Sequence, residues 1–157
     1  MKKFLQFSGL IAAGLALAAF IFLLAGKGLI WREGEYSHTI SGVNVIFGGD
    51  YKLAATALIG WIFVLLAMLA LIAVSVLPLL KVNALDKFAG LITLCSAGLL
   101  LVAAILIFCS KAAFVGANGS FYKNYSLTFA FVFAGILSIG GAVVAALPAC
   151  MKLVGKK

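Results

Sequence analysis

Four long apolar stretches, separated by short polar segments, dominate the pattern of hydrophobic and polar positions along this chain. Each stretch has the length of about 20 residues that an α-helix needs to cross the ~30 Å hydrocarbon core of a bilayer. The pattern therefore predicts an all-α membrane protein, a four-transmembrane-helix bundle forming one integral membrane domain over residues 1–157. The predicted helices cover residues 4–26, 53–80, 88–110 and 125–151.

The longest polar segment, residues 27–52, forms the predicted first outer loop and holds the densest group of ionisable side chains. These are Arg32, Glu33, Glu35, His38 and Asp50. Within this loop, residues 36–40 and 43–47 are rich in β-branched and aromatic side chains and flank Ser41-Gly42. Two such runs around a two-residue turn that contains Gly predict a short β-hairpin.

The other connections are predicted to be simpler. Residues 81–87 form a tight turn, and residues 111–123 form a short polar loop that turns within residues 116–120. Trp61 lies deep in the second apolar stretch, so we expect it to pack between helices rather than at the membrane interface.

The first apolar stretch has an alternative interpretation as a cleaved signal peptide. Lys2 and Lys3 would be its basic start, and residues 16–18 would be its small-residue cleavage site. Apolar residues continue as far as Gly26, however, and three further apolar stretches follow. We therefore expect an uncleaved first helix.

Composition supports the membrane interpretation, because 66% of the residues are hydrophobic and only 10% are charged. A soluble domain has about 45–50% apolar and about 25% charged residues. The net charge of +8 comes from Lys and Arg at the ends of apolar stretches, where long cationic side chains reach lipid headgroups. No basic face could follow nucleic-acid phosphates, so we expect the lipid bilayer, and not nucleic acid, as a partner.

The Lys and Arg distribution also predicts an orientation. Seven of the 12 lie near the chain ends and in residues 81–87, and the other five lie in residues 27–52 and 111–123. Since cytoplasmic loops carry the excess of Lys and Arg, we expect a multi-pass protein of the cell membrane with both termini in the cytoplasm. The Met-Lys-Lys start and the short connections are typical of a bacterial inner-membrane protein.

Short motifs recur in the same order in both halves of the chain. Residues 7–11 resemble residues 88–92, Tyr51-Lys52 resembles Tyr122-Lys123, and Leu77-Pro78 resembles Leu147-Pro148. One interpretation is a parallel duplication of a two-helix unit, residues 4–81 and 85–152. The alternative is chance similarity in a sequence rich in Leu, Ala and Gly.

The fourth apolar stretch carries a small residue at every fourth position, which lets helix backbones approach closely. These residues are Ala130, Ala134, Ser138, Ala142, Ala146 and Cys150. Packing within one four-helix chain is the favoured interpretation. Association with itself or with another membrane protein is the alternative.

No constellation of residues predicts an enzyme, a cofactor site or a metal site. His38 shares its loop with acidic residues at no spacing typical of metal ligands, and the three cysteines form no C-x-x-C pair. No Asp, Glu, Lys, Arg or His lies well inside an apolar stretch, whereas proton relays and cation-coupled transporters usually need one.

Residues 28–31, Gly-Leu-Ile-Trp, resemble the Gly-Leu-Trp motif in the first outer loop of claudin-like four-helix proteins. Here an Ile interrupts the motif, and the two cysteines that follow it in that family are missing. The resemblance covers four residues and implies neither an activity nor a site.

These patterns predict an interaction, accessory or assembly subunit whose recognition surface is the outer loop at residues 27–52. The candidate partner-binding residues are Trp31, Tyr36, His38, Val45 and Phe47. The alternative is a small channel or transporter for an uncharged or apolar substrate, because the absence of charge within the apolar stretches does not exclude a passive path.

Overall fold

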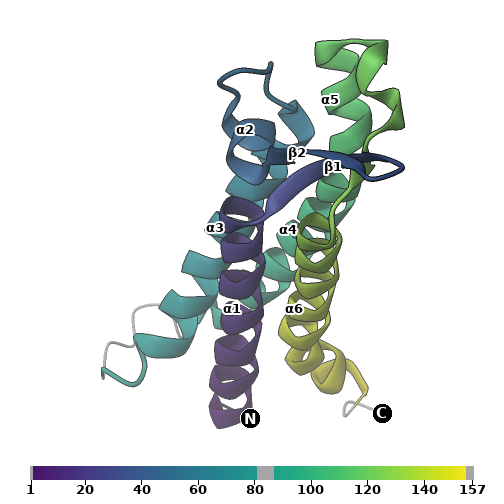
Figure 1. Cartoon of the computed structure of the whole chain (residues 1–157). Coiled ribbons are helices and arrows are strands. Elements are labelled where there is room, and N and C mark those ends of the chain that lie inside the picture. The colour runs from purple at the N-terminus through teal and green to yellow at the C-terminus, as the bar shows by residue number, and fades with distance from the viewer. Residues whose placement is uncertain (1, 81–86, 155–157) are drawn as a thin grey trace.

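The computed structural model describes residues 2–80 and 87–154, and in this part of the chain four long helices form a bundle capped by a small sheet (Figure 1). The long helices are α1 (Lys2–Ala25), α3 (Ala55–Val76), α4 (Ala89–Phe108) and α6 (Phe129–Val154). The shorter elements are β1 (Lys27–Glu33), β2 (Tyr36–Ser41), α2 (Gly42–Phe47), α5 (Ser110–Asn118), the 3₁₀-helix η1 (Ser120–Asn124) and β3 (Ser126–Leu127). The end of the bundle that carries the shorter elements is called the sheet end below.

Each long helix packs against two neighbours that run in the opposite direction. Helix α1 contacts α3 and α6, and α4 contacts the same two helices from the other side. Helices that follow one another along the chain are therefore neighbours in space, as in up-and-down bundles. Helix α1 begins and α6 ends at the end of the bundle opposite the sheet (Figure 1).

Small residues bring α1 and α6 close together. Ala12 and Ala16 of α1 are fully buried, as are Ala134 and Ser138 of α6. A side chain at Gly141 would meet the Ala12 carbonyl oxygen at 3.4 Å. The centre of the predicted row of small residues thus packs inside the bundle, where close approach strengthens dispersion contacts between the helices.

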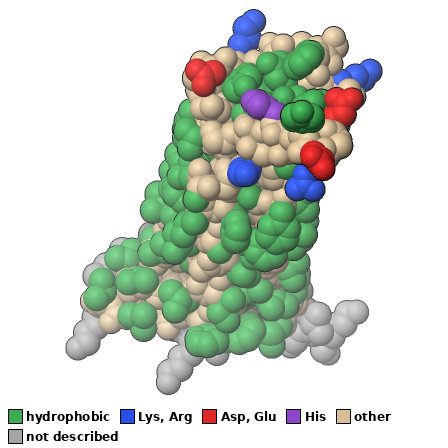
Figure 2. Space-filling view, in the orientation of Figure 1, with side chains coloured by type: hydrophobic (Ala, Val, Ile, Leu, Met, Phe, Trp, Pro, Cys, Tyr) green, Lys and Arg blue, Asp and Glu red, His purple; other side chains and the backbone are tan. Residues whose placement is uncertain are grey.

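The outside of the bundle is apolar. Its four helical segments, Gln6–Ala25, Ala55–Val76, Ala89–Phe108 and Phe129–Pro148, are long and apolar enough to cross a membrane. None of these segments contains Asp, Glu, Lys, Arg or His. Figure 2 shows a continuous apolar body, with acidic side chains and the histidine gathered at the sheet end. The predicted class, a mostly helical four-helix bundle, is confirmed at this level, and the surface is compatible with a multi-pass membrane protein.

The hairpin lies earlier in the chain than predicted. Strand β2 matches the predicted strand at residues 36–40, but it pairs with β1 rather than with residues 43–47. Residues 43–47 lie in helix α2, so this part of the prediction is wrong. The side-chain oxygen of Ser41 accepts a hydrogen bond from the Asn44 N–H at 3.2 Å. Ser41 therefore caps the start of a helix instead of forming a hairpin turn.

Helix α2 fills the space between β1 and the neighbouring ends of α1 and α3. Its Val45 and Ile46 side chains are fully buried. Gly42 lies directly against the end of α1, where any side chain would collide with the Leu23 carbonyl oxygen. Burial of two large aliphatic side chains stabilises the helical conformation of this short segment, since full burial of each contributes about 1.5–3 kcal/mol.

Trp61 packs between elements, as the sequence predicts. Its ring lies 5.3 Å from that of Phe20 on α1 and 5.0 Å from that of Phe47 on α2, measured between ring centroids. These distances are typical of favourable aromatic pairs. The indole therefore connects three helices on the sheet side of the bundle.

The connection between α4 and α6 is more structured than the predicted polar loop at residues 111–123, so the predicted loop is wrong, but the turn predicted within residues 116–120 is confirmed at Gly119. The connection forms α5 and η1, which meet at Gly119 with a φ of 104°. The helical path is interrupted only near Cys109, whose carbonyl still accepts a hydrogen bond from the Ala113 N–H at 3.2 Å. Helix α6 begins at Phe129, later than predicted, because the residues before it pair as β3.

The predicted turn at residues 81–87 lies, except for Lys87, outside the described residues. The duplication of residues 4–81 and 85–152 stays a prediction. Each half contributes two long helices, but the short elements between them differ, with two strands and α2 in the first half and α5, η1 and β3 in the second.

Replacing Gly60 with Leu is expected to lower the free energy of unfolding by about 1–3 kcal/mol through overpacking. A Cβ at Gly60 would lie 3.3 Å from the Ala103 carbonyl oxygen, so α3 would have to move away from α4. Gly98→Leu is the matched control, since a side chain there meets nothing within 4 Å. Thermal unfolding in detergent, followed by circular dichroism, measures both variants, and equal losses would contradict this packing.

Candidate functional site

Strands β1 and β2 form an antiparallel hairpin at the sheet end (Figure 1). The chain turns at Gly34 and Glu35, and the φ of 61° at Gly34 is a conformation that glycine adopts without strain. Trp31 is the register partner of His38, so both side chains lie on one face of the sheet. Glu33 follows Trp31 by two positions and shares that face.

We call the segment between α1 and α3 the first connection and the segment between α4 and α6 the second connection. Strand β3 attaches the second connection to the hairpin, which belongs to the first. Leu29 of β1 pairs with Leu127 of β3, which gives the strand order β2-β1-β3. The Thr128 N–H donates to the carbonyl of Gly28 at 3.1 Å, and the Thr128 hydroxyl donates to the carbonyl of Lys27. The two connections, far apart in the sequence, are therefore joined through their backbones.

Asn118 forms a second link between the two connections. Its Oδ1 accepts a hydrogen bond from the Lys52 N–H, and its Nδ2 donates to the Lys52 carbonyl, both at 2.7 Å. Nδ2 also donates to the Phe114 carbonyl at 3.1 Å, which fixes the orientation of the amide. One side chain thus satisfies both backbone groups of Lys52 and holds the segment between α2 and α3 against α5.

Aromatic rings from both connections pack against one another at the sheet end. Tyr122 lies at the centre, with its ring centroid 5.4 Å from that of Phe114 and 5.3 Å from that of Tyr125. The Tyr51 ring reaches Tyr122 from the first connection at 5.8 Å. These separations lie in the favourable range for aromatic pairs, so the cluster stabilises the contact between the connections.

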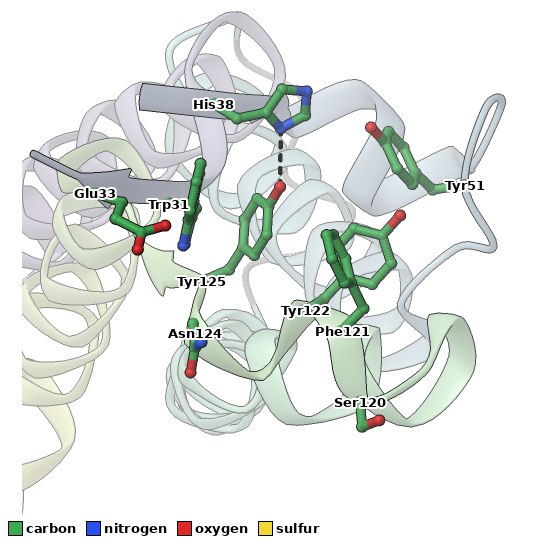
Figure 3. A pocket seen from close by; sticks show the side chains of 9 residues that line it. All are labelled: Trp31, Glu33, His38, Tyr51, Ser120, Phe121, Tyr122, Asn124 and Tyr125. Carbon is green, nitrogen blue, oxygen red and sulfur yellow. Dashed lines mark hydrogen bonds between the residues drawn. The ribbon is translucent and has the colours of Figure 1, made fainter. Parts of the chain in front are cut away.

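An open cavity of about 700 Å³ lies between this cluster and the hairpin (Figure 3). We call it the aromatic hollow. Aromatic rings provide most of its walls, and Glu33 provides a carboxylate. A mainly aromatic wall with a few polar groups is typical of binding sites. The lining side chains are Trp31, Glu33, His38, Tyr51, Ser120, Phe121, Tyr122, Asn124 and Tyr125.

A hydrogen bond of 2.9 Å joins Nδ1 of His38 to the hydroxyl of Tyr125 (Figure 3). Tyr125 is only 5% exposed. Burial raises the pKa of its phenol above the ordinary value of 10.0, and the nearby Tyr51 and Tyr122 raise it further. The phenol is therefore protonated at neutral pH. It donates to Nδ1 of His38 when the ring proton is on Nε2, and it accepts from Nδ1 when the ring proton is there.

The structure brings two of the five predicted partner-binding residues together. Trp31 and His38 are strand partners, and both line the aromatic hollow. Tyr36 is 80% exposed at the start of β2 but does not line the hollow. Phe47 contacts the Trp61 ring with one edge-to-face pair and remains 44% exposed, whereas Val45 is fully buried in α2. Val45 presents no surface to a partner, so it does not belong to the recognition surface that we propose.

Sequence reasoning missed the wall of the hollow that the second connection provides. Phe121, Tyr122 and Tyr125 lie in or just after η1, a segment that was predicted as a plain polar loop and the start of a helix. One signal was present, because Tyr51 and Tyr122 occupy matching positions in the recurring motifs. Their rings meet in the structure.

The side chains of the aromatic hollow combine aromatic rings with a few polar groups. Among the described residues, no group of three or more His, Cys, Asp or Glu side chains could hold a metal ion. The Nδ1 of His38 is bonded to a tyrosine hydroxyl rather than to a carboxylate or a nucleophile. The hollow therefore offers aromatic stacking, hydrogen bonds and one carboxylate.

Comparison of the chain with protein-family models, with curated proteins and with solved structures finds no match. The structural class of the chain is therefore described from its fold and its candidate site alone. The chain is a mostly helical protein with four helices long and apolar enough to span a membrane, and a small three-stranded sheet carries its aromatic hollow.

Asn118→Leu is expected to raise the hydrogen-exchange rate of the Lys52 amide about fivefold to tenfold, since it removes a hydrogen bond worth about 1 kcal/mol. Tyr36→Phe, at an exposed position away from this link, is the control and should keep the parent exchange rate. Exchange measured by mass spectrometry compares the three proteins. Unchanged exchange in Asn118→Leu would show that this link does not form.

Ionisation of Tyr125 is expected to destabilise the sheet end in alkali. The pKa of the Tyr125 phenol is higher in the folded protein than its ordinary value of 10.0. The contribution of Tyr125 to folding stability is therefore fully present below about pH 10 and is lost as the pH rises through the folded pKa. Tyr125→Phe should remove the latest component of an ultraviolet titration of the four tyrosines. Tyr36→Phe is the exposed control, and a late component that persists in Tyr125→Phe would contradict the assignment.

Proposed function

We propose that this chain is an interaction or assembly subunit of a membrane, and that it binds a partner protein through the aromatic hollow. The observation that carries the proposal is the hollow itself, which is open, mainly aromatic and built jointly by both connections. Trp and Tyr dominate the binding energy of many interfaces, because they bury a large area at a low cost in side-chain entropy. The links through β3 and Asn118 hold these rings in place before a partner arrives, which lowers the entropic cost of binding.

The proposed location is the cell membrane, with both termini in the cytoplasm and the sheet end outside. Four apolar helical segments support membrane insertion. The distribution of Lys and Arg, seven against five, supports the orientation. The Met-Lys-Lys start and short connections favour a bacterial inner membrane.

A small channel or transporter for an uncharged or apolar substrate is less well supported. Side chains at Gly60 and Gly141 would meet the carbonyl oxygens of Ala103 and Ala12 at 3.3 and 3.4 Å, so neighbouring helices are in close contact. Close contact of this kind argues against a path between these helices of one copy. The four apolar segments also lack the ionisable side chains that coupled transport usually needs.

A photoreactive residue in place of Phe121, which is 81% exposed and lines the hollow, tests partner binding in native membranes. We expect a discrete cross-link to one partner protein. Trp31→Ala should reduce its yield about tenfold or more, since truncating a central interfacial Trp commonly costs about 2 kcal/mol or more. Mass spectrometry identifies the adduct, and labelled peptides quantify it.

The matched control places the photoreactive residue at Tyr36, which is equally exposed but lies outside the hollow. The same adducts from both positions, or an adduct that Trp31→Ala leaves unchanged, would contradict the proposal. Solute flux in liposomes above that of empty vesicles would favour the channel. Deleting residues 36–47 would test partner binding less specifically than these single substitutions, because it would also remove the fully buried side chains of Ile40 and Val45.

A further inference from the structure

A second cavity, of about 510 Å³, lies at the sheet end beside the start of α6. We call it the basic groove, and we propose that it binds the phosphate group of an anionic membrane lipid. The lining residues are Lys27, Ile30, Arg32, Asn124, Ser126, Leu127, Thr128 and Phe129.

Side-chain alternation along β1 separates the chemistry of the two cavities. Trp31 and Glu33 line the aromatic hollow, whereas Arg32 lines the basic groove, because successive residues of a strand face opposite sides. Lys27 lines the same groove as Arg32, although an odd number of positions separates them. A register irregularity between Lys27 and Leu29 explains this placement, since a bulge shifts the alternation of the residues before it.

Among the described residues, none of those that line the groove is acidic, so its positive charge is not offset there. Lys27 and Arg32 are both exposed, so a ligand can reach them. The guanidinium of Arg32 can donate two parallel hydrogen bonds to phosphate oxygens, and the ammonium of Lys27 acts as a point charge. Asn124 and Ser126 add an amide and a hydroxyl for the remaining oxygens or for headgroup hydroxyls.

The groove lies where an inserted bundle would meet lipid headgroups. Helix α1 ends at Ala25, just before Lys27, and Phe129 is the first residue of α6. Helices that span the hydrocarbon core end at the headgroup layer. Figure 2 shows basic side chains where the sheet end meets the apolar body. Phe129 is 72% exposed, so a lipid held by its phosphate could lay acyl chains against this apolar surface.

The preference of Lys and Arg for cytoplasmic loops does not explain the positions of these two cations. Lys and Arg are favoured in cytoplasmic loops, whereas Lys27 and Arg32 lie on the proposed outer side. Binding of a lipid phosphate gives both residues a role there. This inference rests on the proposed membrane insertion and draws support from the proposed orientation, but it does not depend on partner binding at the aromatic hollow.

Titration of the purified full-length protein with phosphatidylglycerol in mild detergent, followed by native mass spectrometry, tests the groove. We expect saturable binding of one lipid, and about 25-fold weaker binding by the Lys27→Gln/Arg32→Gln variant, at about fivefold for each charge. Arg32→Gln alone should lose about fivefold, and it keeps the test decisive if the double variant is unstable. Diacylglycerol, which has acyl chains but no phosphate, should not compete.

The matched control is Lys52→Gln/Lys111→Gln, which removes the same charge outside the groove and should keep the parent affinity. Equal losses in both double variants, or an unchanged affinity in Lys27→Gln/Arg32→Gln, would overturn the proposal. Inorganic phosphate alone distinguishes the source of the ligand. Binding of free phosphate as tight as that of phosphatidylglycerol would assign the groove to free phosphate, whereas much weaker binding supports the lipid. If the photoreactive residue at Phe121 gives no discrete cross-link while the protein still binds the lipid, the result contradicts the partner proposal alone.

Discussion

The backbone pairing of β1 with β3 is the interaction on which the sheet end depends. An isolated two-stranded hairpin is marginally stable in water, and β1 would otherwise expose part of an unpaired edge. Strand β3 pairs with Leu29 and Ile30 of that edge, and Thr128 extends the contact through two further hydrogen bonds. Since β1 follows α1 and β3 precedes α6, the same pairing joins these two helices.

This pairing requires small residues beneath it. Any side chain at Gly26 would collide with Ala130 of α6, and a side chain at Gly28 would press on Val45 and Phe131. These glycines let β1 pack closely against the ends of the helices. The two faces of β1 then carry different side chains. Trp31 and Glu33 serve the aromatic hollow, and the opposite face serves the basic groove.

The long helices could be predicted because each is an uninterrupted apolar stretch of about 20 residues, long enough for a helix that would span a membrane with its backbone groups paired internally. The short elements depend on contacts between distant residues. Residues 43–47 have the composition of a strand, but the Ser41 cap, the burial of Val45 and the packing of α2 on α1 and α3 favour a helix. Periodicity cannot separate these states in so short a run.

The candidate site was predictable only in the half that lies in the obvious polar loop. Trp31 and His38 were identified there. The part of the wall that η1 provides is held beside the hairpin by β3, which follows η1 along the chain. No local pattern could reveal this, because β3 has only two residues, Ser126 and Leu127, and its pairing depends on the packing of α1 on α6. Asn118 likewise gains its role only from the position of Lys52.

A disulfide between β1 and β3 tests most directly whether both connections form one platform. Ile30 and Ser126 are register partners, so cysteines at these positions lie within the Cα separation of about 4.4–6.8 Å that a disulfide allows. In a protein whose three native cysteines are replaced by Ser, we expect Ile30→Cys/Ser126→Cys to oxidise rapidly in native membranes, as measured by intact mass. A pair that remains reduced, or that oxidises no faster than Tyr36→Cys/Ser126→Cys, would contradict the joined sheet.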